Sequence, residues 1–299
     1  MTTFFEEEEA ADLRLPQQGL RAALSVAGLD PSGGAGIIAD VRTFDALGVY
    51  GTAVAATLTF QSTLGLKGRF DIPADAITEQ LEALFADRMP NAVKTGALGT
   101  AGAARAVGLF LTGKYNGPVV IDPIFAAGKG GVLMEDEGAS ALSSYLIPGA
   151  ALVTPNAAEV ESLSGFKVFD VEDAEAAALR LVAMGARAAL VTGIKVVEDG
   201  VARATDVFCD GEEINVFSVP WIEGLDVHGT GCVLSAAITA CLAKGMTLKD
   251  SVLRAREIVR AAIAGCVSPG RGIACANPWA LSAAGEAAAQ EEAGALETK

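Results

Sequence analysis

Glycines and carboxylates gather in one short stretch, Gly28-Leu-Asp-Pro-Ser-Gly-Gly-Ala-Gly36. Its four glycines allow a tight turn and a close approach of the backbone to a ligand, and Asp30 and Asp40 bring carboxylates near it. Residues 34–39 also match the G-x-G-x-x-[GA] dinucleotide fingerprint. That fingerprint needs an acidic residue about 20 positions further on, where this chain is apolar, so a Rossmann cofactor site is excluded. A purely structural turn between a strand and a helix remains the alternative.

A second stretch, His228-Gly-Thr-Gly-Cys232, opens an apolar segment of helical length. Gly229 and Gly231 leave backbone N–H groups unhindered at a helix N-terminus, where the helix dipole stabilises anions. The same field should favour the thiolate of Cys232 in the first turn. The alternative is a core helix that is capped by glycine and contains a buried cysteine.

The third stretch, Thr154-Pro-Asn-Ala-Ala-Glu159, follows a predicted strand. Asn156 and Glu159 are three residues apart, which places both polar groups on one face of a helix. Their oxygen atoms could hold a hydrated magnesium ion, which keeps several water ligands. An Asn N-cap with a Glu three residues later is also an ordinary capping arrangement, and that alternative stays open.

The elements that would position these stretches alternate between short apolar runs and helix-length segments. Strands are predicted at Ala22–Ala27, Thr52–Leu58, Ala92–Lys94, Pro118–Asp122, Ala151–Thr154 and Arg187–Thr192, and a hairpin at Asp206–Cys209 and Ile214–Val219. Helices are predicted at Gly36–Leu47, Ala74–Ala86, Ala101–Leu111, Ala157–Ser164, Val171–Met184, Gly231–Lys244 and Leu248–Cys266. This alternation indicates an α/β fold with a mostly parallel sheet, covered by helices on both faces. In such sheets ligands bind beyond the carboxyl ends of the strands.

Composition limits the classes of function. The 299 residues carry a formal net charge of −15, which disfavours nucleic acid and anionic membranes as partners. Mean hydropathy is +0.40, but no apolar run reaches the roughly 20 residues that span a bilayer. The acidic N-terminal segment and the five cysteines, which include no C-x-x-C pair, favour a cytoplasmic location. His228 is the single histidine, so sites that need several imidazoles are excluded. We expect an acidic tail at 1–20, one domain at 21–276 and an Ala/Glu-rich tail at 277–299.

Taken in order, these segments resemble the hydroxymethylpyrimidine/phosphomethylpyrimidine kinases of thiamine biosynthesis, within the ribokinase-like superfamily. The resemblance runs from Ala22 to Ile273. Its most specific parts are Ala27–Asp40, Asp122–Ile124, Thr154–Glu159 and His228–Cys232. The family implies a three-layer α/β/α sandwich that uses ATP and Mg²⁺. It phosphorylates the hydroxymethyl oxygen of the pyrimidine and then the resulting monophosphate. Relatives are commonly homodimers.

By position, the resemblance also implies roles for individual residues. These are substrate binding by Gly28, Asp40, Gln61 and Ile124, metal binding by Asn156 and Glu159, contacts to ATP phosphates by Asn156, Thr192 and Lys195, and an anion hole with the catalytic position at Gly229, Thr230, Gly231 and Cys232. Gln61 is chemically suitable, because an amide offers both a donor and an acceptor to an aminopyrimidine. Sugar kinases of the superfamily carry Asp at the position of Cys232. We therefore expect Cys232→Ala to harm the first phosphorylation more than the second, whose acceptor phosphate is already ionised.

The chain departs from the family pattern at two cationic positions. Thr192 stands where the family usually has a lysine, and Gly128 stands where the family has a lysine in the loop after Asp122–Ile124. Lys195 or Lys129 would compensate from nearby positions. Ala97 replaces a methionine that often lines the pyrimidine pocket, so the pocket should be wider.

Three functions remain open from the sequence. The first is the pyrimidine kinase, and the second is a pyridoxal or pyridoxine kinase, which shares the G-T-G-C pattern and an aromatic hydroxymethyl substrate. The third is a pyrimidine-binding sensor without catalysis, which the missing lysines favour and the intact Asn156/Glu159 and Gly229–Cys232 sets disfavour. Adenine contacts are expected from Val216–Val219 and the last helix. All of this requires that Gln61 and the Gly229 amides face one another.

Overall fold

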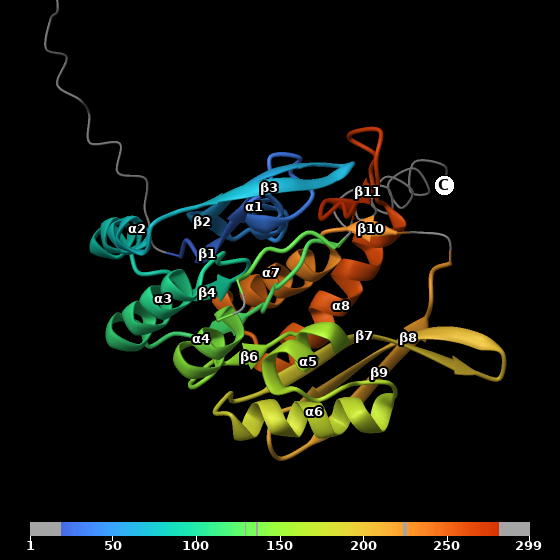
Figure 1. Cartoon of the computed structure of the whole chain (residues 1–299). Helices are drawn as coiled ribbons and strands as arrows, with labels where there is room; N and C mark the ends of the chain where they lie inside the picture. The colour runs from blue at the N-terminus through green and yellow to red at the C-terminus, as the bar shows by residue number, and fades with distance from the viewer. Residues whose placement is uncertain (1–18, 129, 136, 224–225, 281–299) are drawn as a thin grey trace, which may run out of the picture.

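The computed structural model describes residues 19–128, 130–135, 137–223 and 226–280, and these are arranged around a nine-stranded sheet (Figure 1). Lys129 and most of the two predicted tails lie outside the described residues, and the domain boundaries stay a prediction. The sheet has the order β3-β2-β1-β4-β5-β6-β7-β8-β9. Its strands are β1 (Ala22–Leu29), β2 (Tyr50–Ser62), β3 (Gly65–Asp71), β4 (Ala92–Thr95), β5 (Val119–Ile121), β6 (Leu152–Val153), β7 (Ala189–Glu198), β8 (Val201–Cys209) and β9 (Ile214–Pro220).

The centre of the sheet is parallel and its edges are antiparallel. Strands β2, β1, β4, β5, β6 and β7 pair in parallel, whereas β3 pairs antiparallel with β2, and β8 pairs antiparallel with β7 and β9. The predicted mostly parallel sheet is therefore confirmed. Since the carboxyl ends of the parallel strands meet at one edge, the loops that carry the three stretches are brought together there.

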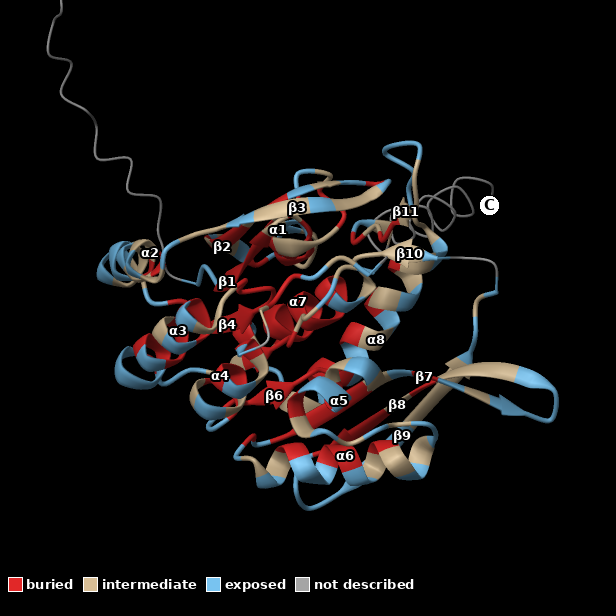
Figure 2. Ribbon diagram, viewed as in Figure 1, coloured by how far each residue is buried: buried red, intermediate tan, exposed pale blue. Residues whose placement is uncertain are grey.

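Helices cover both faces of the sheet. They are α1 (Gly36–Ala46), α2 (Ala74–Asp87), α3 (Ala101–Lys114), α4 (Gly138–Tyr145), α5 (Ala157–Ser164), α6 (Val171–Ala183), α7 (Thr230–Ala243) and α8 (Leu248–Ala264). Successive residues of a strand point to opposite faces. Thus Val93, Ile121 and Val153 pack with α2 to α6, whereas the neighbouring Ala92, Val120 and Leu152 pack on the side of α1, α7 and α8. These are the layers of the predicted α/β/α sandwich, and α7 is buried along nearly its whole length (Figure 2).

Several elements differ from the sequence-based prediction. β2 continues to Ser62 and pairs with β3, a strand that the prediction missed; Thr63 and Leu64 join the two. β7 runs on to Glu198 and turns back through Asp199 and Gly200, which both have positive φ, as a type I′ turn requires. The prediction also missed α4 and the small parallel pair β10 (Val227–His228) and β11 (Ala274–Cys275). The predicted hairpin is confirmed, with Cys209 opposite Ile214.

No helix in the described part of the chain is both long enough and apolar enough to cross a bilayer.

Candidate functional site

A cavity of about 320 Å³ lies where the carboxyl ends of the parallel strands meet. Every stretch singled out in the sequence contributes to its wall. The predicted site residues that line it are Gly28, Asp40, Gln61, Ile124, Asn156, Glu159, Thr192, Gly229, Thr230, Gly231 and Cys232. Gln61 and the Gly229 amides thus share one cavity, as the prediction requires. The roles of these residues stay predictions.

Lys195 does not line this cavity. Its side chain is exposed, and its ammonium nitrogen lies 5.2 Å from the centre of the Trp221 ring. Thr192 does reach the cavity, and its backbone N–H donates to the carbonyl oxygen of Pro155. The cavity wall therefore offers no support for Lys195 as a phosphate contact, and that role stays a prediction.

The glycines of the first stretch are needed because the backbone folds back on itself there. Gly36 has φ +59°, and a Cβ on it would lie 2.1 Å from the carbonyl oxygen of Gly28. The Asp30 carboxylate holds the turn, because it accepts hydrogen bonds from the Ser32 N–H (2.9 Å), the Ser32 hydroxyl (2.8 Å) and the Ala35 N–H (3.1 Å). The turn is therefore held closed, and its two end glycines, Gly28 and Gly36, both line the cavity.

The N-terminus of α7 presents backbone N–H groups to the same cavity. Gly229 is the N-cap with φ +83°, and no side chain caps the helix. A Cβ on Gly229 would lie 1.8 Å from the Gly34 carbonyl oxygen, so the two glycine stretches are in direct contact. Around Gly231, a Cβ would meet nothing within 4 Å. The arrangement suits an anion, because uncapped helical N–H groups carry a partial positive charge.

Cys232 follows in the first turn of α7, and its predicted thiolate is wrong. Burial, together with the negative charges of Asp40 and Asp122, raises the pKa of the Cys232 thiol to about 12. Lys94 and the Gly36 N–H act in the opposite direction but do not compensate. The helix N-terminus alone does not ionise a thiol that is removed from water. Cys232 is therefore a neutral thiol near pH 7.

A buried ionic network lies beneath the cavity, and the sequence-based reasoning missed it. The Lys94 ammonium is 2.7 Å from Asp40 Oδ1 and 3.7 Å from Asp122 Oδ2, and all three side chains are almost fully buried. Burial would lower the pKa of Lys94, but its acidic neighbours outweigh burial and raise it, so the ammonium stays charged. A lysine inside the buried run 92–95 was the available signal, since a buried charge needs a partner.

The predicted substrate residue Asp40 belongs to this network. Its Oδ2 accepts a hydrogen bond of 2.6 Å from the Ser25 hydroxyl, while its Oδ1 faces Lys94. Burial raises the pKa of the carboxyl, and Lys94 and Ser25 oppose that shift. Asp40 therefore contributes to the cavity as part of an ion pair.

Asn156 and Glu159 form a capping box at the N-terminus of α5. The Glu159 N–H donates to Asn156 Oδ1 (3.0 Å), and the Asn156 N–H donates to Glu159 Oε2 (2.9 Å). The capping alternative is thus correct, but the pair also lines the cavity. Burial, together with the negative charge of Asp122, raises the pKa of Glu159 to about 8. The carboxylates of Glu159 and Asp122 repel each other, and a bound divalent cation would offset that repulsion.

The cation would depend on further ligands. In the part of the chain that the structure describes, no group of three or more His, Cys, Asp or Glu side chains could hold a metal ion. A magnesium ion at Glu159 and Asp122 would therefore need water and phosphate oxygens, which is the coordination that Mg²⁺ prefers.

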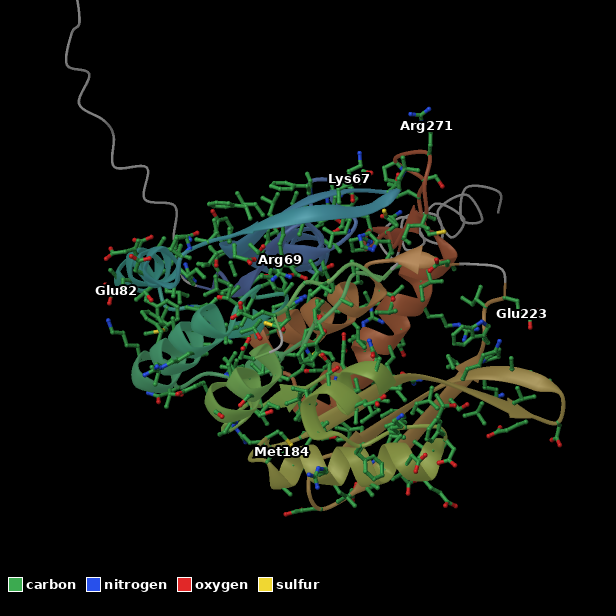
Figure 3. The ribbon with its side chains drawn as sticks, in the orientation of Figure 1. Lys67, Arg69, Glu82, Met184, Glu223 and Arg271 are labelled. Atoms are coloured by element: carbon green, nitrogen blue, oxygen red, sulfur yellow. The ribbon has the colours of Figure 1, made fainter. Side chains whose placement is uncertain are left out.

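Arg69 of β3, which is labelled in Figure 3, holds the loop after β5, and that loop lines one side of the cavity. Its guanidinium donates to the carbonyl oxygens of Val132 (2.7 Å) and Gly99 (3.2 Å) and to the carboxylate of Asp71. Gly128 of this loop lines both the main cavity and an adjoining one of about 140 Å³, which extends under the turn between β2 and β3. Gln61 and His228 lie on the wall that the two cavities share.

Comparison with known proteins places this geometry among small-molecule kinases. A family model described as phosphomethylpyrimidine kinase matches residues 30–277. A hydroxymethylpyrimidine/phosphomethylpyrimidine kinase from Bacillus subtilis is 35% identical over 259 residues, which cover 87% of this chain and 95% of the relative. A bifunctional thiamine biosynthesis protein from Geobacter sulfurreducens is 40% identical over 84% of this chain and 51% of its own length. An ADP complex of Bacillus subtilis pyridoxal kinase superimposes with a TM-score of 0.79 at 33% identity, covering 88% of this chain and 99% of that one.

Proposed function

Because the chain belongs to the phosphomethylpyrimidine kinase family, we propose that it transfers phosphoryl groups from ATP to 4-amino-5-hydroxymethyl-2-methylpyrimidine, in thiamine biosynthesis. The first transfer makes the monophosphate and the second makes the diphosphate. The chain is a phosphotransferase, and the ADP complex of a related kinase supports ATP as its phosphoryl donor. Membership in a kinase family disfavours the sensor without catalysis.

One observation carries this proposal. A single cavity joins Gln61 and Gly28, which suit a small heterocycle, to the Gly229–Cys232 amides and the Glu159 carboxylate, which suit a polyphosphate and its cation. Phosphoryl transfer depends chiefly on positioning the two substrates and on stabilising negative charge. A cavity that holds the acceptor beside an anion-binding helix N-terminus meets both requirements.

Each group then has a physical task in the proposed reaction. The uncapped N–H groups of α7 stabilise charge on the transferred phosphoryl group. The buried Lys94 ammonium offsets the negative charge of Asp40 and Asp122 beneath them. Glu159, with Asn156 and the neighbouring Asp122, would hold Mg²⁺, which when bound neutralises phosphate charge. The neutral Cys232 thiol stands at the position of the sugar-kinase base.

The proposal is tested by counting phosphoryl groups. We expect the purified protein with ATP and MgCl₂ to consume two equivalents of ATP per aminopyrimidine, with the monophosphate and then the diphosphate seen by ³¹P NMR. Glu159→Gln should raise the Mg²⁺ concentration that gives half-maximal rate. The matched control Glu161→Gln changes an exposed carboxylate on the same helix, which lies 3.5 Å from the Lys167 ammonium. ATP consumption without a phosphorylated pyrimidine would refute the proposed substrate.

The second candidate is a pyridoxal kinase, which the superposition on the Bacillus subtilis enzyme favours. Ala97 in the cavity wall leaves more room than the methionine that is usual in the family, so a more substituted ring could enter. The same assay with pyridoxal in place of the pyrimidine measures this activity.

Two further expectations stay proposals. A homodimer is tested by sedimentation velocity, and the exposed Phe60 and Phe70 on β2 and β3 are apolar side chains that a second copy could cover. A cytoplasmic location is tested by cell fractionation.

A further inference from the structure

Asp30 and His228 connect the two glycine stretches of the cavity. His228 Nε2 lies 2.9 Å from Asp30 Oδ2, and the two side chains are 10% and 4% exposed. The two residues are 198 positions apart in the sequence. Asp30 belongs to the turn after β1, and His228 directly precedes the N-cap of α7. No step of the proposed reaction uses this pair.

Each partner is fixed on its own side of the contact. The Asp30 carboxylate already holds its own turn through the Ser32 and Ala35 N–H groups. The backbone of His228 is held in the β10–β11 pair, and its carbonyl oxygen accepts from the Ala276 N–H (3.0 Å). A displacement of either side chain would therefore displace the stretch that carries it.

The contact between the two stretches is tight. A Cβ on Gly34 would lie 2.7 Å from His228 Cδ2, and a Cβ on the following Gly229 would lie 1.8 Å from the Gly34 carbonyl oxygen. The ring of His228 therefore packs directly on the first stretch, and the first residue of the anion site follows it. The hydrogen bond thus acts at the point where the two halves of the cavity meet.

The direction of the hydrogen bond follows from the charge of Asp30. Burial would raise the pKa of this carboxyl, but its hydrogen bonds with His228 and Ser32 outweigh burial and lower it, so Asp30 is ionised near pH 7. A carboxylate only accepts, so His228 Nε2 carries the hydrogen and donates it. The amide nitrogen of Gln61, the predicted heterocycle contact, lies 2.9 Å from His228 Nε2 and 3.4 Å from Asp30 Oδ2. Because Nε2 carries the hydrogen that it gives to Asp30, it has no lone pair for the Gln61 N–H, and Gln61 donates to Asp30 Oδ2. One carboxylate oxygen therefore orients both side chains.

We propose that His228 is a positioning residue, which holds the heterocycle pocket in register with the N–H groups of α7 by donating its Nε2 hydrogen to Asp30. It does so without touching the reacting atoms. The proposal rests on the proposed function only for the identity of the substrates. Its physical content is a coupling between two halves of one cavity.

The test compares His228→Gln with His228→Met. The two side chains have nearly the same length and both lack the ring, but only Gln keeps an N–H that can reach Asp30. Thr239→Val is the control, because it removes a buried hydrogen bond (2.7 Å to the Ser235 carbonyl oxygen) from α7 outside the cavity wall. For each protein we would measure kcat, the dissociation constants of aminopyrimidine and of the non-hydrolysable ATP analogue AMP-PCP, alone and together, and the melting temperature.

We expect His228→Met to lower kcat by about 10- to 100-fold, the range expected for a lost hydrogen bond to a charged group. Each ligand alone should bind within about threefold of wild type, and the effect of one ligand on the affinity of the other should disappear. His228→Gln should recover most of kcat and of this coupling. The control should stay within about twofold of wild type in kcat.

Three results would overturn the proposal. The first is wild-type kcat and coupling in His228→Met. The second is a weaker affinity for the pyrimidine with kcat intact, which would make His228 a substrate contact. The third is an equal loss in the Gln and Met variants, which would assign the effect to ring packing. If the wild type phosphorylates only pyridoxal, the proposed pyrimidine substrate is refuted. The same comparison of the His228 variants is then made with pyridoxal. If it phosphorylates neither, the binding measurements still decide the coupling.

Discussion

Removal of the buried Lys94 ammonium, in Lys94→Met, should destabilise the protein in a pH-dependent way. In the variant Asp40 has lost the cation 2.7 Å away and is fully buried, so it either carries an uncompensated charge or takes up a proton. Protonation at pH 7 from the ordinary pKa of 3.8 costs about 4 kcal/mol, at about 1.4 kcal/mol per unit. Because burial already raises the pKa of Asp40 in the wild type, we expect a loss of about 3 kcal/mol, in line with broken buried pairs.

The sign of the pH effect is the decisive part of this prediction. Since the cost is that of protonating a carboxyl, it shrinks by about 1.4 kcal/mol per pH unit, so the loss of about 3 kcal/mol at pH 7 should fall well below about 1 kcal/mol at pH 5. The assay is urea unfolding of wild type and variant at pH 5 and pH 7. The double variant Asp40→Asn/Lys94→Met should recover at least half of the loss, because it leaves no charge behind at that pair. A loss below about 1 kcal/mol at pH 7, or an equal loss at both pH values, would refute the reasoning.

Three further predictions concern the cavity itself. Gly229→Ala should lower kcat/KM at least 100-fold, because its Cβ would meet the Gly34 carbonyl oxygen and its φ is +83°. The control Gly113→Ala, whose Cβ meets nothing within 4 Å, should leave kcat/KM unchanged, and comparable losses would contradict the contact. Because the Cys232 thiol is neutral near pH 7 and cannot take up the hydroxyl proton, Cys232→Ala should slow both transfers by similar factors of about threefold or less in single-turnover assays, in place of the selective loss expected from the sequence; a loss confined to the first transfer would contradict this. Without nucleotide, the melting temperature should fall as the pH rises from about 5 to above 8, because the folded pKa of Glu159 is raised and its protonated form is favoured. Glu159→Gln keeps the capping box and should remove this part of the pH dependence, and an unchanged profile would count against the burial of Glu159.

Local sequence signals located the elements that carry their own capping or turn chemistry. Helix α5 begins and ends at the predicted residues because the Asn156/Glu159 box starts it and Gly165, with φ +69°, ends it. The alternation of buried strands and helices likewise indicated the layers. β3 was missed because Gly65–Asp71 contains two glycines and two cations in place of alternating apolar residues, and only its pairing with β2 holds it in the sheet.

The features that the sequence did not reveal depend on contacts between distant residues. Lys94 meets Asp40 across 54 positions, and His228 meets Asp30 across 198. The expectation for Cys232 considered only the local field of the helix and not burial, which depends on how α1 and β4 pack around α7. Motif chemistry therefore identified the cavity walls, while the protonation states within them required the tertiary structure.

The central claim is that one cavity holds an aminopyrimidine against the N–H groups that bind the transferred phosphoryl group. Its most direct test is kcat/KM with ATP for 4-amino-5-hydroxymethyl-2-methylpyrimidine and for pyridoxal, measured side by side. We expect the pyrimidine to be preferred at least tenfold, with Gln61→Leu lowering its kcat/KM about 10- to 100-fold through lost hydrogen bonding. Turnover of pyridoxal alone, or a Gln61→Leu variant as active as wild type on the pyrimidine, would contradict the account.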